Sequence, residues 1–375
     1  MHKIEMVDLK RQYLKIKPQI DTAIQSVIDA TQFIKGPKVK EFEDNLAKYL
    51  QVKHVIGVAN GTDALQIAMM ALDLQPEDEV ITADFTYAAT AEVIALLRLK
   101  PILVEVNPKT FNIDTKALEK AITPKTKAIV PVHLFGQCAD MEAIMKIAEK
   151  HNLFVIEDVA QAIGADYTFA DKTIHKAGTI GDIGCTSFFP SKNLGCYGDG
   201  GALYTNDDIL ATRIRMIANH GQSVQYYHDK VGVNSRLDTI QAAILNEKLP
   251  YLDEYAKRRN ELADFYDKAF ADCPQLTVPS RKKGSTHVFH QYTLLLNGVN
   301  RDEFRKKLAE KNVPSMIYYP IPLHNQKAYQ DPRFTDADFP ISTDLCQRVV
   351  SLPMHTEMDS EQREYIVKSV LESIK

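Results

Sequence analysis

The stretch that decides the fold is Ser187-Phe188-Phe189-Pro190-Ser191-Lys192-Asn193-Leu194-Gly195, which ends an apolar segment and leads into a glycine-rich run to Gly201. Its single lysine, Lys192, stands beside aromatic groups and flexible backbone. Desolvation disfavours an ammonium ion, so a lysine in such surroundings loses its proton more readily. A neutral amine can then form a Schiff base with a carbonyl compound. An ordinary surface lysine in a turn fits this stretch equally well.

An acidic residue upstream gives the lysine a chemical context. The run Leu153-Phe154-Val155-Ile156-Glu157-Asp158 predicts a buried parallel strand that brings Asp158 to its C-terminal end. Ligands of open α/β sheets bind at the carboxyl ends of the strands. A lysine for a Schiff base and an acid for a pyridine nitrogen are the two groups that pyridoxal phosphate needs most. Lys192 and Asp158 therefore indicate a pyridoxal 5'-phosphate cofactor.

Composition excludes several classes of protein. The chain has 375 residues, more than one core usually fills, and a net charge of −4, so there is no basic excess to argue for nucleic acid. No apolar run approaches a membrane span, and the first residues lack the apolar core of a signal peptide, so we expect a cytoplasmic protein with no membrane partner. The five cysteines lack paired spacing and predict reduced thiols, with no disulfide framework and no metal site.

Alternating strands and helices predict the fold class. Residues 1–50 read as helical, with a break at Gly36-Pro37. Beyond them, helical patterns separate strands expected near residues 54–58, 79–82, 101–106, 128–132, 153–158 and 201–205. This alternation predicts an α/β fold with a mainly parallel sheet and helices on both faces. Residues 166–183 read as an irregular surface excursion.

A composition shift predicts two domains. Pro250 falls inside the helical pattern of residues 238–270 and is expected to divide it. We therefore expect a large domain over residues 1–250, including the N-terminal helical segment, and a smaller α+β domain over residues 251–375. A closing helix is expected near residues 359–374.

Several candidate ligand groups remain ambiguous from their local sequence. Gly61 and Thr62 follow a strand and begin a helix, whose unpaired N–H groups bind phosphate, but an ordinary helix cap explains them as well. Tyr87 follows a strand end, where its ring could stack on a flat cofactor or simply pack. Asn234 could be a capping group, and Arg236 a solvated charge.

Taken together, these segments resemble the DegT/StrS-type sugar aminotransferases over nearly the whole chain. The resemblance rests on Asn60-Gly61-Thr62-Asp63, Ile156-Glu157-Asp158, the stretch at 187–195, Asn234-Ser235-Arg236-Leu237-Asp238 and Tyr319-Pro320-Ile321-Pro322-Leu323. It implies the fold-type I architecture of pyridoxal phosphate-dependent transferases. It also implies a homodimer with shared active sites, since Asn234 would reach the cofactor phosphate of a second subunit.

The resemblance assigns roles residue by residue. Lys192 would form the Schiff base and move the proton, and Asp158 would hold the pyridine nitrogen protonated. The remaining cofactor contacts would be the phosphate ligands Gly61, Thr62 and Ser187, the ring-stacking Tyr87, and Gln161 at the ring hydroxyl oxygen. The candidates for binding substrate are Arg236, Tyr319 and His324.

The implied reaction moves an amino group from L-glutamate to a nucleotide-linked keto sugar. The motifs look closest to the subgroup that aminates C3 of UDP-2-acetamido-2-deoxy-3-oxo-glucuronate for O-antigen and lipopolysaccharide synthesis. A dTDP-linked 3-keto or 4-keto 6-deoxyhexose is the alternative substrate. A dehydratase of this family would have histidine in place of Lys192, and a non-catalytic regulator would be expected to lose Lys192 or Asp158. A cysteine desulfurase would need a reactive cysteine on a mobile loop.

Overall fold

The computed structural model describes residues 2–374 and contains a central sheet of seven strands. Their spatial order is β1-β9-β8-β5-β4-β2-β3. Only β9 is antiparallel to its neighbours, so the predicted mainly parallel sheet is confirmed. The strands are β1 (His54–Val58), β2 (Glu79–Ala83), β3 (Lys100–Val104), β4 (Thr126–Val130), β5 (Phe154–Asp158), β8 (Ile183–Ser187) and β9 (Gly201–Thr205).

Both faces of this sheet are covered by helices, because its strands are apolar on both sides. On β5, Val155 packs in one hydrophobic cluster and the next residue, Ile156, in another, as the two-residue period of a strand requires. The Val155 cluster includes residues of α6 (Thr115–Lys120) and α7 (Met141–His151). The Ile156 cluster includes residues of α4 (Gly61–Ala71), α5 (Ala89–Leu96) and α8 (Asp208–Ile217).

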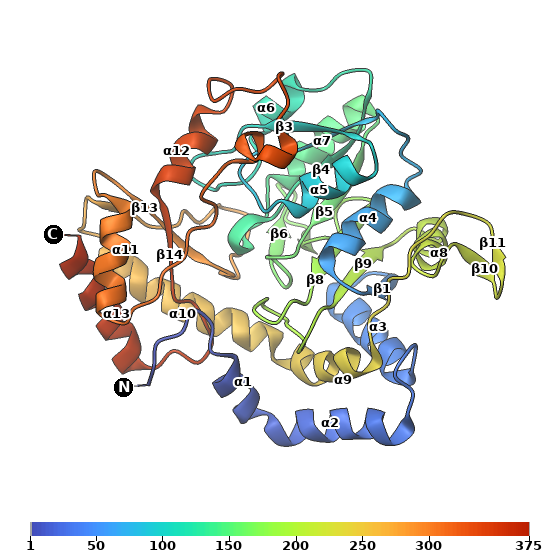
Figure 1. The fold of residues 1–375 in the computed structure, drawn as a ribbon, viewed down its shortest axis with the longest axis horizontal. Coiled ribbons are helices and arrows are strands. Elements are labelled where there is room, and N and C mark those ends of the chain that lie inside the picture. Colours follow the sequence, from blue (N-terminus) through green and yellow to red (C-terminus); the bar gives the residue numbers. More distant parts are fainter. Residues whose placement is uncertain (1, 375) are drawn as a thin grey trace.

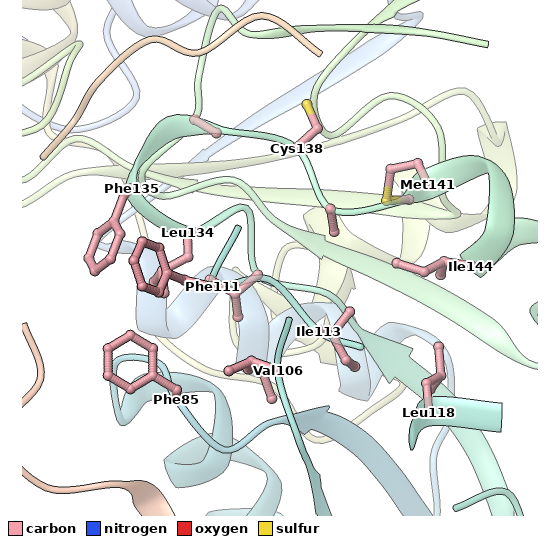
Figure 2. Packing of buried hydrophobic residues seen from close by; sticks show 14 of the residues in the cluster. Phe85, Val106, Phe111, Ile113, Leu118, Leu134, Phe135, Cys138, Met141 and Ile144 are labelled. Carbon is pink, nitrogen blue, oxygen red and sulfur yellow. The ribbon is translucent and has the colours of Figure 1, made fainter. Parts of the chain in front are cut away.

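Aromatic rings gather at one end of the Val155 cluster. Figure 2 shows Phe85, Phe111 and Phe135 grouped there, while Leu118 and Ile144 lie at the other end. The ring centroids of Phe111 and Phe135 are 5.5 Å apart, and Phe85 lies 6.1 Å from the ring of Tyr319. Edge-to-face contacts at such distances favour a fixed packing arrangement. These rings support the sheet edge at which β5 ends.

The long helices lie along one side of the molecule (Figure 1). α1 (Leu9–Lys15) and α2 (Lys17–Ala30) are followed by a break and by α3 (Pro37–Leu50), as the Gly36-Pro37 pair predicts. α9 (Thr239–Lys248) packs against α2 and α3, and a short 3-10 turn, η2 (Leu249–Tyr251), separates it from α10 (Leu252–Phe270). The division predicted at Pro250 is therefore confirmed.

A second core lies in the C-terminal part of the chain. Here β12 (Leu276–Thr277), β13 (Tyr292–Leu296) and β14 (Val349–Leu352) form an antiparallel sheet that packs with α10, α11 (Arg301–Glu310) and α13 (Ser360–Ser373). Each part of the chain also contributes to the core of the other part. Ile4, near the N-terminus, packs in the second core, and Leu345 of α12 (Pro340–Arg348) packs in the Val155 cluster of the first. The domain boundary at residue 250 stays a prediction.

Two short hairpins complete the fold. β6 (Asp166–Thr168) and β7 (Ile174–Lys176) pair within the stretch expected to be irregular, so that prediction was wrong in part; three-residue strands are too short to show a period. β10 (Gln222–Val224) and β11 (Tyr227–His228) form a hairpin that projects from the body of the molecule (Figure 1). Within residues 2–374, no helix is both long and apolar enough to cross a membrane.

Candidate active site

Asp158 ends β5 at the carboxyl edge of the sheet, with a buried side chain. Its carboxylate accepts hydrogen bonds from the Thr90 hydroxyl and from the Ala160 amide, each at 3.1 Å. Burial raises the pKa of Asp158, while the Ala160 amide, the charge of Lys192 and the Thr90 hydroxyl oppose that rise. Two donors leave acceptor sites on the carboxylate unused, so it can also bind a protonated ring nitrogen.

The loop that carries Lys192 begins where β8 ends, at Ser187. Its base is closed by backbone hydrogen bonds from the Cys196 amide to the Phe188 carbonyl at 2.8 Å and from the Lys192 amide to the Phe189 carbonyl at 2.8 Å. A Cβ atom at Gly195 would lie 2.2 Å from the Pro190 carbonyl oxygen. Only glycine fits there, so the glycine after the lysine is required by the tight turn itself.

The side chain of Lys192 is half-buried and points to no fixed partner. Within residues 2–374, no hydrogen bond or ion pair reaches its amine. Burial lowers the pKa of Lys192 to about 8, and the nearby Asp158 carboxylate acts in the opposite direction. An amine with this pKa is about one-tenth neutral at pH 7, far more than an ordinary lysine, and both Schiff-base formation and proton transfer require the neutral form.

An anion site lies beside the loop, at the start of α4. Asn60 caps the helix by accepting the Asp63 amide at 2.8 Å, whereas in the described chain the amides of Gly61 and Thr62 donate to no other group. A Cβ atom at Gly61 would lie 2.7 Å from the Cβ of Ser187, so the helix N-terminus and the serine are in close contact. Free amides, the helix dipole and a hydroxyl group together suit a phosphate.

Gln161, Tyr319 and Tyr87 form a connected group of side chains. Gln161 accepts the Phe135 amide through Oε1 at 2.8 Å and donates through Nε2 to the Tyr319 hydroxyl at 3.0 Å. These bonds fix the amide orientation and leave its second N–H free for a ring oxygen. The Tyr319 ring lies 6.1 Å from the ring of Tyr87, which is 60% exposed. Tyr87 thus presents an open aromatic face.

Comparison with known proteins identifies this arrangement. Residues 14–371 match the DegT/DnrJ/EryC1/StrS aminotransferase family. The chain belongs to this family. It is 48% identical to the UDP-2-acetamido-2-deoxy-3-oxo-D-glucuronate aminotransferase of Pseudomonas aeruginosa, covering 95% of this chain and 96% of that protein. It is 43% identical to a UDP-N-acetyl-3-dehydro-alpha-D-glucosamine 3-aminotransferase of Acidithiobacillus ferrooxidans, covering 96% and 95%.

A solved structure supports the same cofactor. The Bacillus subtilis protein NtdA, crystallised with bound cofactor PMP, has 32% sequence identity and a TM-score of 0.91, with 100% of this chain and 86% of that chain covered. The residues of this aminotransferase fit pyridoxal phosphate, because an under-satisfied acid, a partnerless lysine and a free helix N-terminus meet at one sheet edge. The protein is a pyridoxal phosphate-dependent aminotransferase, with the fold-type I architecture expected from its sequence.

Asn234 and Arg236 of the aminotransferase stand apart from this group. Ser235 anchors their segment, since its hydroxyl accepts the Ala59 amide at 3.0 Å. Asn234 is exposed, and Arg236 lines a cavity of about 300 Å³ together with Lys35. The guanidinium of Arg236 makes no hydrogen bond or ion pair with any described residue. Neither side chain is bonded to the lysine site of its own chain.

The structure gives His324 two carboxylate partners. Its backbone amide and Nδ1 each lie 2.8 Å from an Asp84 carboxylate oxygen, and its Nε2 lies 2.9 Å from Asp336. Burial acts against the charged ring, but the carboxylates of Asp336 and Asp84 raise the pKa of His324 above its usual value. Both ring nitrogens are engaged, so a bond to a substrate carboxylate would require one of these pairs to break.

Sequence reasoning missed two groups behind the site. Thr90 donates a hydrogen bond to Asp158 from the start of α5. A polar residue at the start of an apolar helix, at the same sheet edge as Asp158, is the pattern by which the sequence could have indicated it. Glu157 accepts the amides of Gly178, Ile180 and Gly181 and pairs with His133 on the opposite face of β5. No local pattern reveals those partners, because most are backbone groups.

Proposed function

We propose that this aminotransferase transfers the amino group of L-glutamate to C3 of UDP-2-acetamido-2-deoxy-3-oxo-glucuronate. The reaction would serve O-antigen and lipopolysaccharide synthesis in the cytoplasm. The observation that carries the proposal is the meeting of Asp158 and Lys192 at one sheet edge, in a chain that shares nearly half its residues with the Pseudomonas enzyme over almost its full length.

The chain's own residues have separable tasks in this reaction. Pyridoxal phosphate, when bound, supplies the electron sink for the substrate carbon. Lys192 would carry the proton between the substrate carbon and the C4′ carbon of the cofactor, a task suited to an amine whose pKa is lowered to about 8. Asp158 holds the pyridine nitrogen protonated through a charge-assisted hydrogen bond. The amides of Gly61 and Thr62, with Ser187, hold the phosphate.

The site would be completed by a second copy of the chain. The Asn234 side chain is exposed and bonds to no other described residue, and the adjoining β10–β11 hairpin exposes aromatic side chains, with Tyr226 80% and Tyr227 69% accessible. Exposed aromatic groups at the end of a projecting hairpin favour a protein interface. In a two-fold homodimer each Asn234 would contact the cofactor phosphate of the other subunit.

Arg236 is the residue on which the sugar assignment depends. A glucuronate carries a carboxylate at C6, where a 6-deoxyhexose carries a methyl group. A guanidinium that has no partner within the described chain can take that carboxylate in a bidentate bond. Tyr319 and His324 remain proposed substrate contacts, and His324 also holds its own segment to Asp84.

A substrate panel tests the proposal. Purified enzyme is loaded with pyridoxal phosphate, converted with L-glutamate, and offered UDP-2-acetamido-2-deoxy-3-oxo-glucuronate or a dTDP-linked 3-keto 6-deoxyhexose. We expect kcat/KM to favour the uronate by ~10²-fold or more, and Arg236→Gln to remove most of that preference. Preference for the dTDP sugar would overturn the substrate assignment. A sedimentation measurement that finds only monomers would overturn the dimer.

A further inference from the structure

Lys248, in the last turn of α9, is a buried lysine that the reaction described above does not use. It is 1% exposed, and no carboxylate of the described residues pairs with it. Its ammonium donates to the Gly195 carbonyl at 2.5 Å and lies 5.3 Å from the centre of the Tyr197 ring. Burying an ammonium without a counter-ion is unfavourable, and burial lowers the pKa of Lys248 to about 8.

The acceptor of that bond is the last residue of the loop that carries Lys192. Gly195 turns so tightly that its α-carbon faces the Pro190 carbonyl, and the next residue, Cys196, closes the loop on the Phe188 carbonyl through its amide at 2.8 Å and its thiol at 3.1 Å. The Lys248 bond therefore ties the closing end of the loop to α9.

α9 is a firm support for such a bond. It packs against α2 and α3, and its residues Ala242, Leu245 and Ala243 are buried. Nearer to Lys192, the side-chain amide of Asn193 donates through Nδ2 to the Val288 carbonyl at 3.0 Å. Two residues that follow Lys192 in the loop are thus held, Gly195 by α9 and Asn193 by the segment that precedes β13.

We propose that Lys248 is a positioning residue for Lys192. Through the Gly195 carbonyl it fixes the backbone of the 187–195 loop, so that the Lys192 amine is held within reach of the cofactor and of the substrate carbon. Lys248 itself touches neither. The inference rests on the role of Lys192 in the aminotransferase reaction and is independent of which sugar accepts the amine.

The test compares Lys248→Met with Tyr266→Phe. Tyr266 is equally buried and donates to the Pro353 carbonyl at 3.2 Å, so its variant also leaves one buried carbonyl without a donor, but far along the chain from Lys192. In the cofactor-free protein, we expect Lys248→Met to speed hydrogen exchange at the Lys192 and Cys196 amides by on the order of tenfold. Tyr266→Phe should leave exchange at those two amides unchanged.

The loaded enzyme gives two further readouts. The rate of the half-reaction with L-glutamate should fall about tenfold in Lys248→Met with KM little changed, because displacement of the amine affects proton transfer more than binding. The pH midpoint of the visible band of the bound cofactor should also shift, while Tyr266→Phe keeps the wild-type midpoint. Exchange, rate and midpoint all equal to those of Tyr266→Phe would overturn the proposal.

A second variant covers the case in which the methionine variant does not fold. Lys248→Gln keeps an N–H donor on a shorter, neutral side chain that cannot reach Gly195 at the same distance. We expect exchange and rate changes in the same direction as for methionine; wild-type values for both would overturn the positioning role. If the wild type does not react with L-glutamate, the donor assignment fails, but amide exchange and the cofactor band still decide the role of Lys248.

Discussion

Glu157 and Asp158 are adjacent carboxylates on β5, and they face opposite sides of the sheet in very different surroundings. Glu157 accepts three backbone amides at 2.6–2.8 Å and pairs with the His133 ring at 2.9 Å. Among residues 2–374, Asp158 accepts only one hydroxyl and one amide, both at 3.1 Å. The first carboxylate has all its acceptor sites in use, whereas the second has acceptor capacity left over.

This difference separates a carboxylate that stabilises the fold from a carboxylate that takes part in the reaction. The bonds of Glu157 tie β5 to the segment at residues 178–181 and to the end of β4, so its contribution is to stability. Asp158 is buried with too few donors, an arrangement that is unfavourable for folding alone and useful once a cationic ring nitrogen is bound. Incomplete hydrogen bonding therefore points to the functional residue more directly than burial does.

The largest effect is expected from neutralising each acid in turn. Asp158→Asn should lower kcat by ~10²- to 10⁴-fold while the protein stays folded, because the ring nitrogen loses its charged partner. Glu157→Gln should instead lower the free energy of unfolding by about 3 kcal/mol, because an amide group then faces backbone N–H donors. Steady-state kinetics and urea unfolding of both variants separate the two outcomes.

Two outcomes would contradict the separate roles of Glu157 and Asp158. If Glu157→Gln loses kcat as severely as Asp158→Asn at equal folded fraction, the two carboxylates do not have separate tasks. If Asp158→Asn is mainly unstable, the acid is structural and its incomplete hydrogen bonding has no functional meaning.

A smaller effect is expected on the titration of Lys192. In the cofactor-free enzyme, the amine should react with an acylating reagent with a midpoint near the pKa of about 8. Since the Asp158 carboxylate favours the ammonium form, Asp158→Asn should move the midpoint to lower pH. Glu157→Gln should leave it unchanged, because Glu157 is not among the groups that shift the pKa of Lys192. Peptide mass spectrometry across pH measures the labelled fraction, and a midpoint near 10 would refute the burial argument.

The sequence was sufficient to predict the two reacting residues that lie in short, distinctive motifs. The apolar run that ends in Asp158 and the motif around Lys192 each carry their residue to the same edge of the sheet, so both were predicted. The Thr90 hydroxyl that bonds Asp158 was not predicted, because it comes from a segment 68 positions away. His324 and Asp84 are separated by 240 positions and meet only in the folded chain.

Backbone partners explain most of what could not be predicted. Lys248 binds a main-chain carbonyl, and Glu157 binds main-chain amides, so no complementary side chain marks either residue in the sequence. Lys248 reads as one more lysine in the last turn of a helix, where a lysine ordinarily favours the helix dipole. Only its burial in the folded protein distinguishes it.

The smallest effect is expected at Thr90, whose hydroxyl is the one side-chain donor to Asp158 among the described residues. Thr90→Val keeps the shape of the side chain but removes that donor, so the carboxylate form of Asp158 loses support and its pKa rises further. The acid must be ionised to hold the ring nitrogen, so the acidic limb of the kcat/KM profile should move to higher pH, with a loss of about 3- to 10-fold near that limb and little at alkaline pH. Thr90→Ser, which keeps the hydroxyl, should retain the wild-type profile. A uniform loss at all pH values in Thr90→Val would mean that the shape of the side chain matters and that its hydrogen bond does not affect the ionisation of Asp158. The carboxylate of Asp158, like that of Glu157, would then not depend on a side-chain hydroxyl.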